Sequence, residues 1–471
     1  MFSLISENPF VVLHREANNV WKSNESRMSM LGVNERYIDI CQNIKDRFLS
    51  LDYKPILPIL EEKRAKSLSY LNSVVISASE NELGRSDSID NVRLLSSKKC
   101  TGCGLCSLVY PIGAIEMKED KEGFLGPVVN DSLCKECHLC AERCPSIHPL
   151  QKNSIIDAYA CISKNKLKEE SASGGCFITI AQYYIEVLKG VVYGVVFDNK
   201  LVCFHTEATT LKQIIPMQNS KYVQSNMNDI YLKVKERLEI GIRVLFSGTP
   251  CQVAGLKSYL HKEYDNLLTV EIVCHGVPNQ KFWKYYLQHI TTWKVKSYYF
   301  RNRNNKKINK TTYEATVEFQ DKTKSTVRKI LPYEDPYYGP FLKSESFRNS
   351  CYYCQYARKD RIADITIGDV DNSKTNREFY PLESKSMLLV NTEKGKELWY
   401  DVKGLFNFIP LDYEEESKVN LQLCMPSKQP TARKYLYRDL EMMKWQDFVK
   451  KYTTKVSPIK QVILFCLEKL F

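Results

Sequence analysis

The sequence lacks several features that would assign it to a class at once. Residues 1–9 have neither a basic start nor a long apolar core, and no run of about 18 apolar residues follows, so neither a secretory signal nor a membrane-spanning helix is predicted. No dense lysine or arginine tract occurs, although the net charge is +12. Such diffuse basicity argues against nucleic acid and favours acidic small partners or an acidic electron donor.

Two segments partly resemble a membrane anchor and a basic tract, the features that the sequence lacks. Residues 458–471 are apolar with spaced lysines, and we expect a helix that packs on its own domain rather than a membrane anchor. A mild basic concentration is expected to be a solvated loop and comprises Arg301, Arg303, Lys306, Lys307 and Lys310. A cytoplasmic protein is therefore expected.

What the sequence does contain is cysteine, 17 in all. Without an export signal, metal or redox chemistry is favoured over disulfides. Cys100, Cys103, Cys106, Tyr110 and Pro111 recur 34 positions later as Cys134, Cys137, Cys140, Cys144 and Pro145. The pattern C-x2-C-x2-C-x3-C-P is that of a bacterial two-cluster ferredoxin, in which the fourth cysteine of each copy serves the other cluster.

The alternative to iron–sulfur clusters is zinc, which also uses paired CxxC motifs. Zinc needs four ligands per site, whereas each loop here supplies three cysteines and a Cys-Pro follows. Gly102 and Gly104 leave the first loop's backbone free to direct amides at cluster sulfurs. The spacing therefore favours iron–sulfur clusters.

Because the fourth cysteine of each copy serves the other cluster, the two cluster sites have different numbers of cysteine ligands. Cys100, Cys103, Cys106 and Cys144 complete one four-iron cluster. The other site takes Cys134, Cys137 and Cys140, and Tyr110 stands in its fourth position. It is a three-iron cluster, a four-iron cluster completed by another residue such as Cys161 or Cys176, or a degenerate site.

The length of 471 residues predicts two or three domains. Strand-like and helix-like segments alternate after residue 155, with strands expected at Val191–Phe197, Arg243–Ser247 and Leu267–Val273. We expect an α+β chain with these parts: a small α/β N-terminal appendage (1–80), a linker (81–98), a ferredoxin-like two-cluster module (99–150), a mixed α/β flavin-binding domain (151–440) and a helical tail (441–471).

Six ordered motifs in the large domain resemble the coenzyme F-420 hydrogenase/dehydrogenase beta-subunit family. They are Ser171–Gly175, Lys221–Ser225, Leu245–Gln252, Val273–Pro278, Cys351–Cys354 and Asp364–Asp369. The resemblance covers about residues 100–400 and implies an iron–sulfur flavoprotein that binds FAD. Where the family continues with an aromatic residue and a glycine, this chain has Val370–Asn372.

Several residues are candidates for contact with the flavin. A Ser/Gly loop before a helix offers hydroxyls, unhindered amides and a positive helix end to a pyrophosphate, although such loops are often mere caps. With the strand-to-helix turn at residues 247–251, the predicted cofactor-binding set is Ser171, Ser173, Gly174, Gly175, Lys221, Tyr222, Ser247, Gly248 and Thr249. His275 is the predicted proton-transfer residue.

Four further cysteines provide enough thiols for a third cluster near the flavin, namely Cys251, Cys274, Cys351 and Cys354. The alternatives are that Cys251 and Cys274 are small core residues, and that Cys351 and Cys354 bind zinc or nothing.

The first 75 residues resemble the C-terminal end of a polysaccharide pyruvyl transferase. The similarity rests on Asn8–Arg15, Arg27–Arg36 and Glu61–Ser67, and the nucleotide-binding bulk of that enzyme is missing. No transferase activity is expected.

Together these patterns predict an oxidoreductase. A ferredoxin-like donor supplies single electrons, the clusters relay them, and FAD collects them in pairs for a small-molecule substrate. The resemblance implies a sugar-linked substrate of surface-polysaccharide synthesis. The alternative is a non-catalytic electron-transfer subunit of a larger redox complex.

Overall fold

The computed structural model describes residues 90–109, 113–302, 314–320, 325–380 and 383–453, together with the backbone of two short strands nearer the N-terminus. The chain divides into two units, Met1–Ser88 and Ile89–Phe471. In the first unit, β1 (Val12–His14) and β2 (Tyr37–Asp39) pair in parallel. The remaining pyruvyl-transferase-like residues and the expected helix at 458–471 lie outside the described residues.

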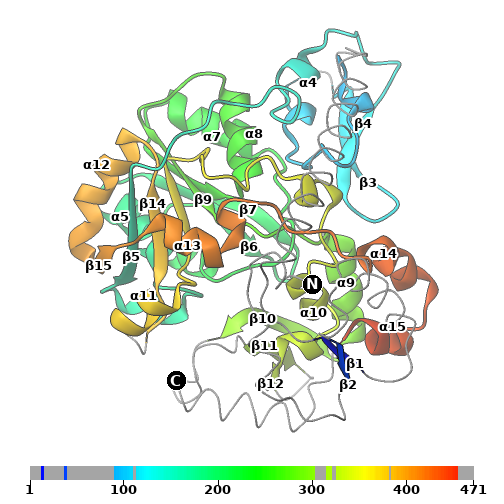
Figure 1. Ribbon diagram of the computed structural model, residues 1–471. Helices are drawn as coiled ribbons and strands as arrows, with labels where there is room; N and C mark the ends of the chain where they lie inside the picture. Colours follow the sequence, from blue (N-terminus) through cyan, green and yellow to red (C-terminus); the bar gives the residue numbers. More distant parts are fainter. Residues whose placement is uncertain are drawn as a thin grey trace, which may run out of the picture. The chain divides into compact units, whose positions relative to one another are not determined.

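The second unit is built on an eight-stranded mixed sheet (Figure 1). The strand order is β15 (Phe406–Pro410), β5 (Asp157–Ser163), β14 (Ser386–Val390), β13 (Ile365–Asp369), β9 (Leu267–Ile272), β8 (Val244–Gly248), β6 (Val191–Phe197) and β7 (Cys203–Ala208). Strands β13, β9, β8 and β6 run parallel, and antiparallel strands flank them. The predicted α+β class is confirmed, and the three expected strands form within one residue of their expected bounds.

Alternating side chains of the parallel strands build a separate core on each face of the sheet. Leu245 of β8 packs with α5 (Cys176–Glu186) and α12 (Glu393–Val402). Its neighbour Phe246 packs on the other face with α7 (Ile230–Glu239) and α8 (Pro250–Leu260). These strands are therefore buried on both sides, as parallel strands usually are.

A third, aromatic-rich core lies under a small antiparallel sheet of β10 (Lys294–Asn302), β11 (Glu314–Gln320) and β12 (Ser325–Ile330). Helices α9 (Gln280–His289), α10 (Tyr338–Leu342), α14 (Arg433–Met442) and α15 (Trp445–Tyr452) contribute to it. The remaining helices are short, α6 (Leu211–Ile214), α11 (Ser373–Glu378) and α13 (Tyr413–Val419). Phe448 and Tyr452 belong to this core, so the described start of the expected tail packs into the domain.

The cysteine module consists of a hairpin, β3 (Ile115–Glu119) with β4 (Leu125–Val129), and the short helix α4 (Leu139–Glu142). Val92, in the segment expected to be a linker, is buried among Cys106, Cys140 and Cys144 because an apolar side chain there closes the module's small core. A bidentate ion pair between Glu122 and the buried Arg433, at 2.6–3.0 Å, ties the hairpin to the large domain.

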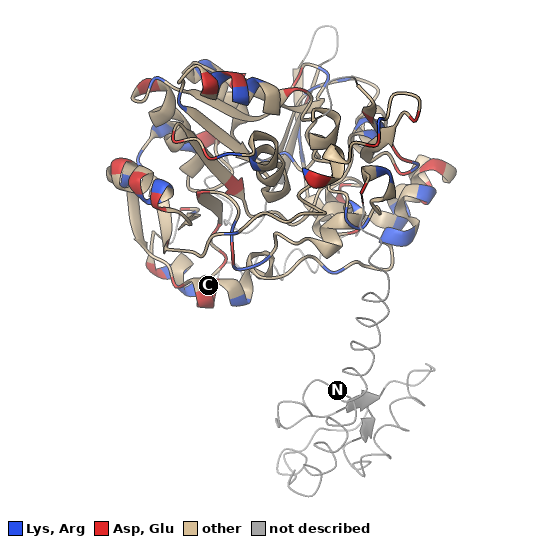
Figure 2. Cartoon of the chain, turned by 90° about the horizontal axis from the view of Figure 1, so that it is seen from above, with Lys and Arg blue, Asp and Glu red and all other residues tan. Residues whose placement is uncertain are grey.

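Among the described residues, no helix combines the length and the apolar character that a membrane crossing requires. Basic (blue) and acidic (red) residues are interspersed along the helices in Figure 2. This distribution agrees with the diffuse charge expected from the sequence.

Candidate redox site

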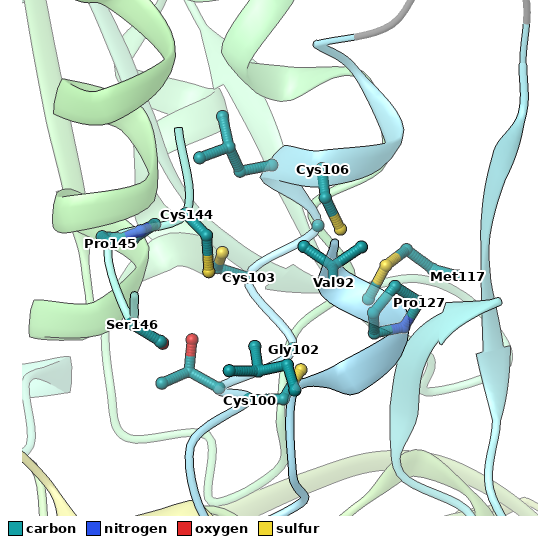
Figure 3. A pocket seen from close by; sticks show the side chains of 14 residues that line it. Val92, Cys100, Gly102, Cys103, Cys106, Met117, Pro127, Cys144, Pro145 and Ser146 are labelled. Carbon is teal, nitrogen blue, oxygen red and sulfur yellow. The ribbon is translucent and has the colours of Figure 1, made fainter. Parts of the chain in front are cut away.

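The first cysteine loop surrounds one small pocket. Cys100, Cys103, Cys106 and Cys144 all line it, and Figure 3 shows these side chains reaching the same space from different directions. Gly102 adopts a left-handed backbone (φ +67°), and a Cβ there would lie 2.7 Å from Arg348 Nη1 and 2.8 Å from the Leu125 carbonyl. Only glycine therefore permits this loop.

The arrangement of these thiols suits a cluster. A cubane is held by thiolates at separate corners, and the four cysteines line one shared space. The residues present therefore fit an iron–sulfur cluster.

Burial and crowding hold protons on the unloaded thiols. Burial, with the neighbouring Cys144, Cys100 and Cys251, raises the pKa of Cys103 to about 12. Burial and adjacent cysteines, Cys140 of the second loop among them, also raise the pKa of Cys106 well above its ordinary value. Iron binding must release these protons.

The second cysteine loop is more open to solvent. Cys137 is exposed, Cys134 is half-buried and Cys140 is buried. Tyr110, expected in place of the fourth ligand, lies outside the described residues. Cys161 and Cys176, the suggested replacements, lie in the core of the large sheet with their sulfurs 3.0 Å apart. Neither belongs to the module's core, so that suggestion is wrong.

One arginine contacts each loop. Arg348, which is buried, donates to the Cys100 carbonyl at 2.8 Å and to Cys100 Sγ at 3.6 Å. Arg93 donates to Cys134 Sγ at 3.4 Å in the second loop. Positive donors at cluster sulfurs stabilise the reduced, more negative cluster.

This pairing gives a cluster-specific prediction. Replacing Arg348 with Met should lower the potential of the first cluster by on the order of 50–100 mV, the effect of losing one charge-assisted hydrogen bond. Arg93→Met should lower only the second cluster's potential, by less because the contact is exposed. A redox titration followed by electron paramagnetic resonance measures both. Equal shifts of both clusters in either variant would contradict the assignment.

The four further cysteines also come together. Cys251 begins α8, Cys274 follows β9, and Cys351 and Cys354 lie in and after the short helix Asn349–Tyr353. Burial first, then Cys351, Cys251 and Cys354, raises the pKa of Cys274 well above its ordinary value. The structure thus brings all four within electrostatic reach of one another.

The first loop adjoins this second group through α8. A Cβ on Gly255 of α8 would lie 3.2 Å from Cys103 Cβ, and Cys251 is one turn earlier on the same helix. Thr249 and Gln252 form a capping box that fixes the start of α8, with Pro250 at its first turn. The cap sets the position of Cys251 relative to Cys103.

A cavity of about 510 Å³ opens where three parallel strands end. Strands β8, β9 and β13 deliver Ser247–Thr249, Val273–His275, and the pair Asp369 and Asp371 to its wall. Ligands of open α/β sheets bind at this edge. The volume is that of a pocket for a large organic cofactor.

Most predicted cofactor-binding residues line this cavity, together with Cys251 and Cys274. They are Ser171, Ser173, Gly175, Lys221, Tyr222, Ser247, Gly248 and Thr249. His275, the predicted proton-transfer residue, also lines it. Gly174 lies beneath the wall, where a Cβ would be 2.3 Å from the Cys161 carbonyl. Cys351 and Cys354 do not line it. The roles of these residues toward a cofactor remain predictions.

Two groups in the wall suit a polar or anionic ligand. Burial lowers the pKa of Lys221 to about 8, and its ammonium donates to the carbonyls of Gln218 and Asn219 at 2.8 and 3.4 Å. Gln218 accepts from Ser171 at 2.6 Å, while its buried Nε2 has no hydrogen-bond partner in the described structure. An unsatisfied buried donor at a cavity wall is readily explained by a missing ligand.

The cavity wall also carries other titratable groups, on β10 and after β9 and β13. Arg301 is buried and forms an ion pair with Asp369 at 2.6 Å, so its assignment to a solvated loop is wrong. The other four basic residues of that stretch lie outside the described residues. Burial, together with Asp369 and Glu416, raises the pKa of Asp371 to about 6. Burial lowers the pKa of His275, so its neutral form dominates at pH 7.

The cysteine loops and the adjoining cavity define an iron–sulfur redox protein. Residues 99–147 match the 4Fe-4S dicluster domain family. Residues 241–411 match the family described as the C-terminal part of the beta subunit in coenzyme F420 hydrogenase/dehydrogenase. The resemblances to both families expected from the sequence are confirmed over these residues.

Two known proteins show the extent of the similarity. The coenzyme F420-dependent sulfite reductase of Methanocaldococcus jannaschii is 23% identical over 313 residues, which are 65% of this chain and 46% of that protein. The chain thus spans about half the length of this curated relative. A chain of the xenon-derivatized F420-reducing [NiFe] hydrogenase complex from Methanosarcina barkeri matches 57% of this chain and 91% of its own, at 15% identity and a TM-score of 0.39.

Proposed function

We propose that this protein is an oxidoreductase that passes electrons between a soluble one-electron carrier and a flavin-type cofactor held in the 510 Å³ cavity. The observation that carries the proposal is a series of cysteines, each within electrostatic reach of the next, between the exposed loop and the cavity wall. It runs from exposed Cys137 to Cys140 and Cys106, then through Cys103 to Cys251 and Cys274. Iron–sulfur clusters on such a series would relay single electrons.

The cofactor is proposed by its chemistry. The sequence predicted FAD, whereas the matched family and the sulfite reductase carry coenzyme F420 in their names. Both compounds share a tricyclic ring and a phosphate-bearing side chain. Lys221 and the unpaired Gln218 amide fit the polar and anionic parts of either, and Cys251 and Cys274 border the same cavity. When bound, the ring supplies two-electron chemistry.

The cavity residues would position that ring and manage its protons. Tyr222 stacks on Phe341 with ring centroids 4.1 Å apart, which fixes an aromatic surface at the wall. Asp371 can release or take up a proton near neutral pH, and neutral His275 can accept one. The matched families name no sugar substrate, and sulfite appears only in the name of the relative. Neither compound is therefore proposed as a substrate of this chain.

Anaerobic purification with metal and cofactor analysis tests this function. We expect about eight irons per chain for the two ferredoxin clusters and no stoichiometric zinc. A third cluster on Cys251, Cys274, Cys351 and Cys354 would raise the iron content to about twelve. FAD should co-purify with the chain, or the purified chain should bind added FAD or coenzyme F420. Comparing the two added compounds identifies which of them the cavity binds. One or two zincs without iron, or no binding of either compound, would refute the proposal.

The pH dependence of cofactor turnover gives a further prediction. Asp371 is protonated below about pH 6 and charged above it, so a step that uses it as an acid should slow as the pH rises through about 6. Asp371→Asn should lower the rate by roughly 10²–10⁴-fold and flatten this limb of the profile. Asp360→Asn is the control, since Asp360 does not line the cavity. An unchanged limb near pH 6 in Asp371→Asn would remove Asp371 from the reaction.

A further inference from the structure

Cys161 and Cys176 form a close pair of thiols outside all three cysteine groups considered for clusters. Cys161 lies in β5 and Cys176 is the first residue of α5, and their sulfurs are 3.0 Å apart. Cys161 is fully buried, and Cys176 is 2% exposed. A disulfide needs about 2.05 Å between the sulfurs, so a shift of about 1 Å would join them.

Glycine geometry holds the two elements together. Gly174 packs directly on β5, since a Cβ there would lie 2.3 Å from the Cys161 carbonyl, and its own carbonyl accepts from Ser163 N at 2.8 Å. Gly175 then turns the chain with a left-handed backbone (φ +86°) and starts α5. The loop therefore places Cys176 against Cys161 by backbone constraint, independently of any bond between the sulfurs.

Only one of the two thiols borders the cavity. Cys176 lines it together with Ser171, Lys221 and Cys251. Cys161 does not line it and lies in β5 beside β14, with its Sγ 3.4 Å from the Ser386 carbonyl. One cysteine thus faces the proposed cofactor, and the other faces only its partner and the protein interior.

Their surroundings distinguish the two sulfurs. Cys176 is the first residue of the eleven-residue helix α5 and borders the cavity. Burial, with the hydrogen bond between the two thiols, raises the pKa of Cys161 well above its ordinary value, and either sulfur can be the donor in that bond. Cys176 is therefore the sulfur placed to exchange electrons with the cofactor, and Cys161 is the one that would close the disulfide.

We propose that Cys161 and Cys176 are a redox-active dithiol–disulfide couple that exchanges an electron pair with the flavin-type cofactor in the cavity, an inference that rests on the proposed function. In the oxidising direction both S–H bonds break and one S–S bond forms. The two electrons and one proton reduce the oxidised ring, and the second proton goes to solvent. The reverse reaction restores two thiols. The couple would store two electrons beside clusters that carry one at a time.

Peptide mapping of the whole anaerobically purified chain tests this couple. One set of samples is equilibrated with mixtures of reduced and oxidised glutathione, and another with oxidised FAD or coenzyme F420 and no other oxidant. After acid quenching and alkylation, trypsin cuts at Lys164, Lys166 and Lys168, which separate the two cysteines. A disulfide then appears as a pair of linked peptides.

We expect linkage in both sets, and its loss when dithionite reduces the cofactor. Cys161→Ala and Cys176→Ala should each abolish the linked pair, so that either variant suffices if the other fails to fold. Cys203→Ala is the matched control, because Cys203 is equally buried in the same sheet and its sulfur bonds only the Val223 carbonyl. This control should keep the linkage.

The glutathione samples and the cofactor samples distinguish failure of the dithiol couple from failure of the proposed function. If neither cofactor binds, the proposed function fails, and the glutathione set still decides whether the couple exists. Free, alkylated Cys161 and Cys176 under fully oxidised glutathione would overturn the couple itself. Linkage with glutathione and none with a bound oxidised cofactor would overturn the electron exchange.

Discussion

Cys103→Ala is expected to remove about four irons and to stop electron transfer to the cavity, while the second cysteine loop keeps its own iron. The position of Cys103 between the first loop and α8 explains this expectation. Cys103 lines the first-loop pocket and also packs against α8 at Gly255, one turn after Cys251. Removing this ligand takes away the carrier between the exposed loop and the cavity wall. The loss of cofactor reduction should exceed the roughly 10–100-fold that follows loss of a supporting residue.

The measurement combines iron analysis with stopped-flow reduction of the bound cofactor by reduced ferredoxin. Cys424→Ala is the matched control, because Cys424 is half-buried and its sulfur contacts only backbone carbonyls of its own helical region. That variant should retain wild-type iron and rate. Reduction of the cofactor at the wild-type rate in Cys103→Ala would exclude an electron path through the first loop.

The parts of this site that the sequence predicted are those set by local spacing. Three cysteines at two-residue gaps close one loop whatever surrounds them, and Gly102 marks its left-handed turn. The strand-to-helix turn at Ser247–Thr249 follows from a buried strand and a capping box of adjacent residues. Parallel strands then bring such turns to one edge of the sheet.

The residues that the sequence did not reveal act across long separations. Arg348 contacts Cys100 from 248 positions away, and Arg301 reaches Asp369 across 68. A single sequence carries no periodic signal for such pairs. Asp371 had a local signal, since it stands two residues after the Gly-Asp end of the Asp364–Asp369 motif, where the chain departs from the pattern of the family it resembles. A carboxyl group at that edge of a sheet is a candidate for cavity chemistry.

Lys221→Met is expected to weaken binding of the anionic cofactor by about 2–5 kcal/mol, the range for truncating one partner of a buried charge pair. In the free protein burial lowers the pKa of Lys221 to about 8, so its ammonium is charged below that pH and neutral above it. A bound phosphate would favour the charged form and raise this pKa. Affinity should therefore be highest below pH 8 and fall as the pH rises through 8, by up to about tenfold per pH unit.

Equilibrium titration of the cofactor-free protein with FAD and with coenzyme F420, between pH 6 and about pH 9.5, measures this dependence. Lys221→Met should bind weakly at every pH and show no decline above 8, because the titrating ammonium is gone. Lys221→Arg retains a charge at all these pH values and should recover part of the affinity while also losing the decline. Both variants are needed because Lys221 donates to two backbone carbonyls, at Gln218 and Asn219, so its removal also loosens that loop. A purely structural role would weaken binding in both variants and leave the wild-type affinity flat across pH 8, whereas an electrostatic role requires the wild-type decline and the arginine rescue together.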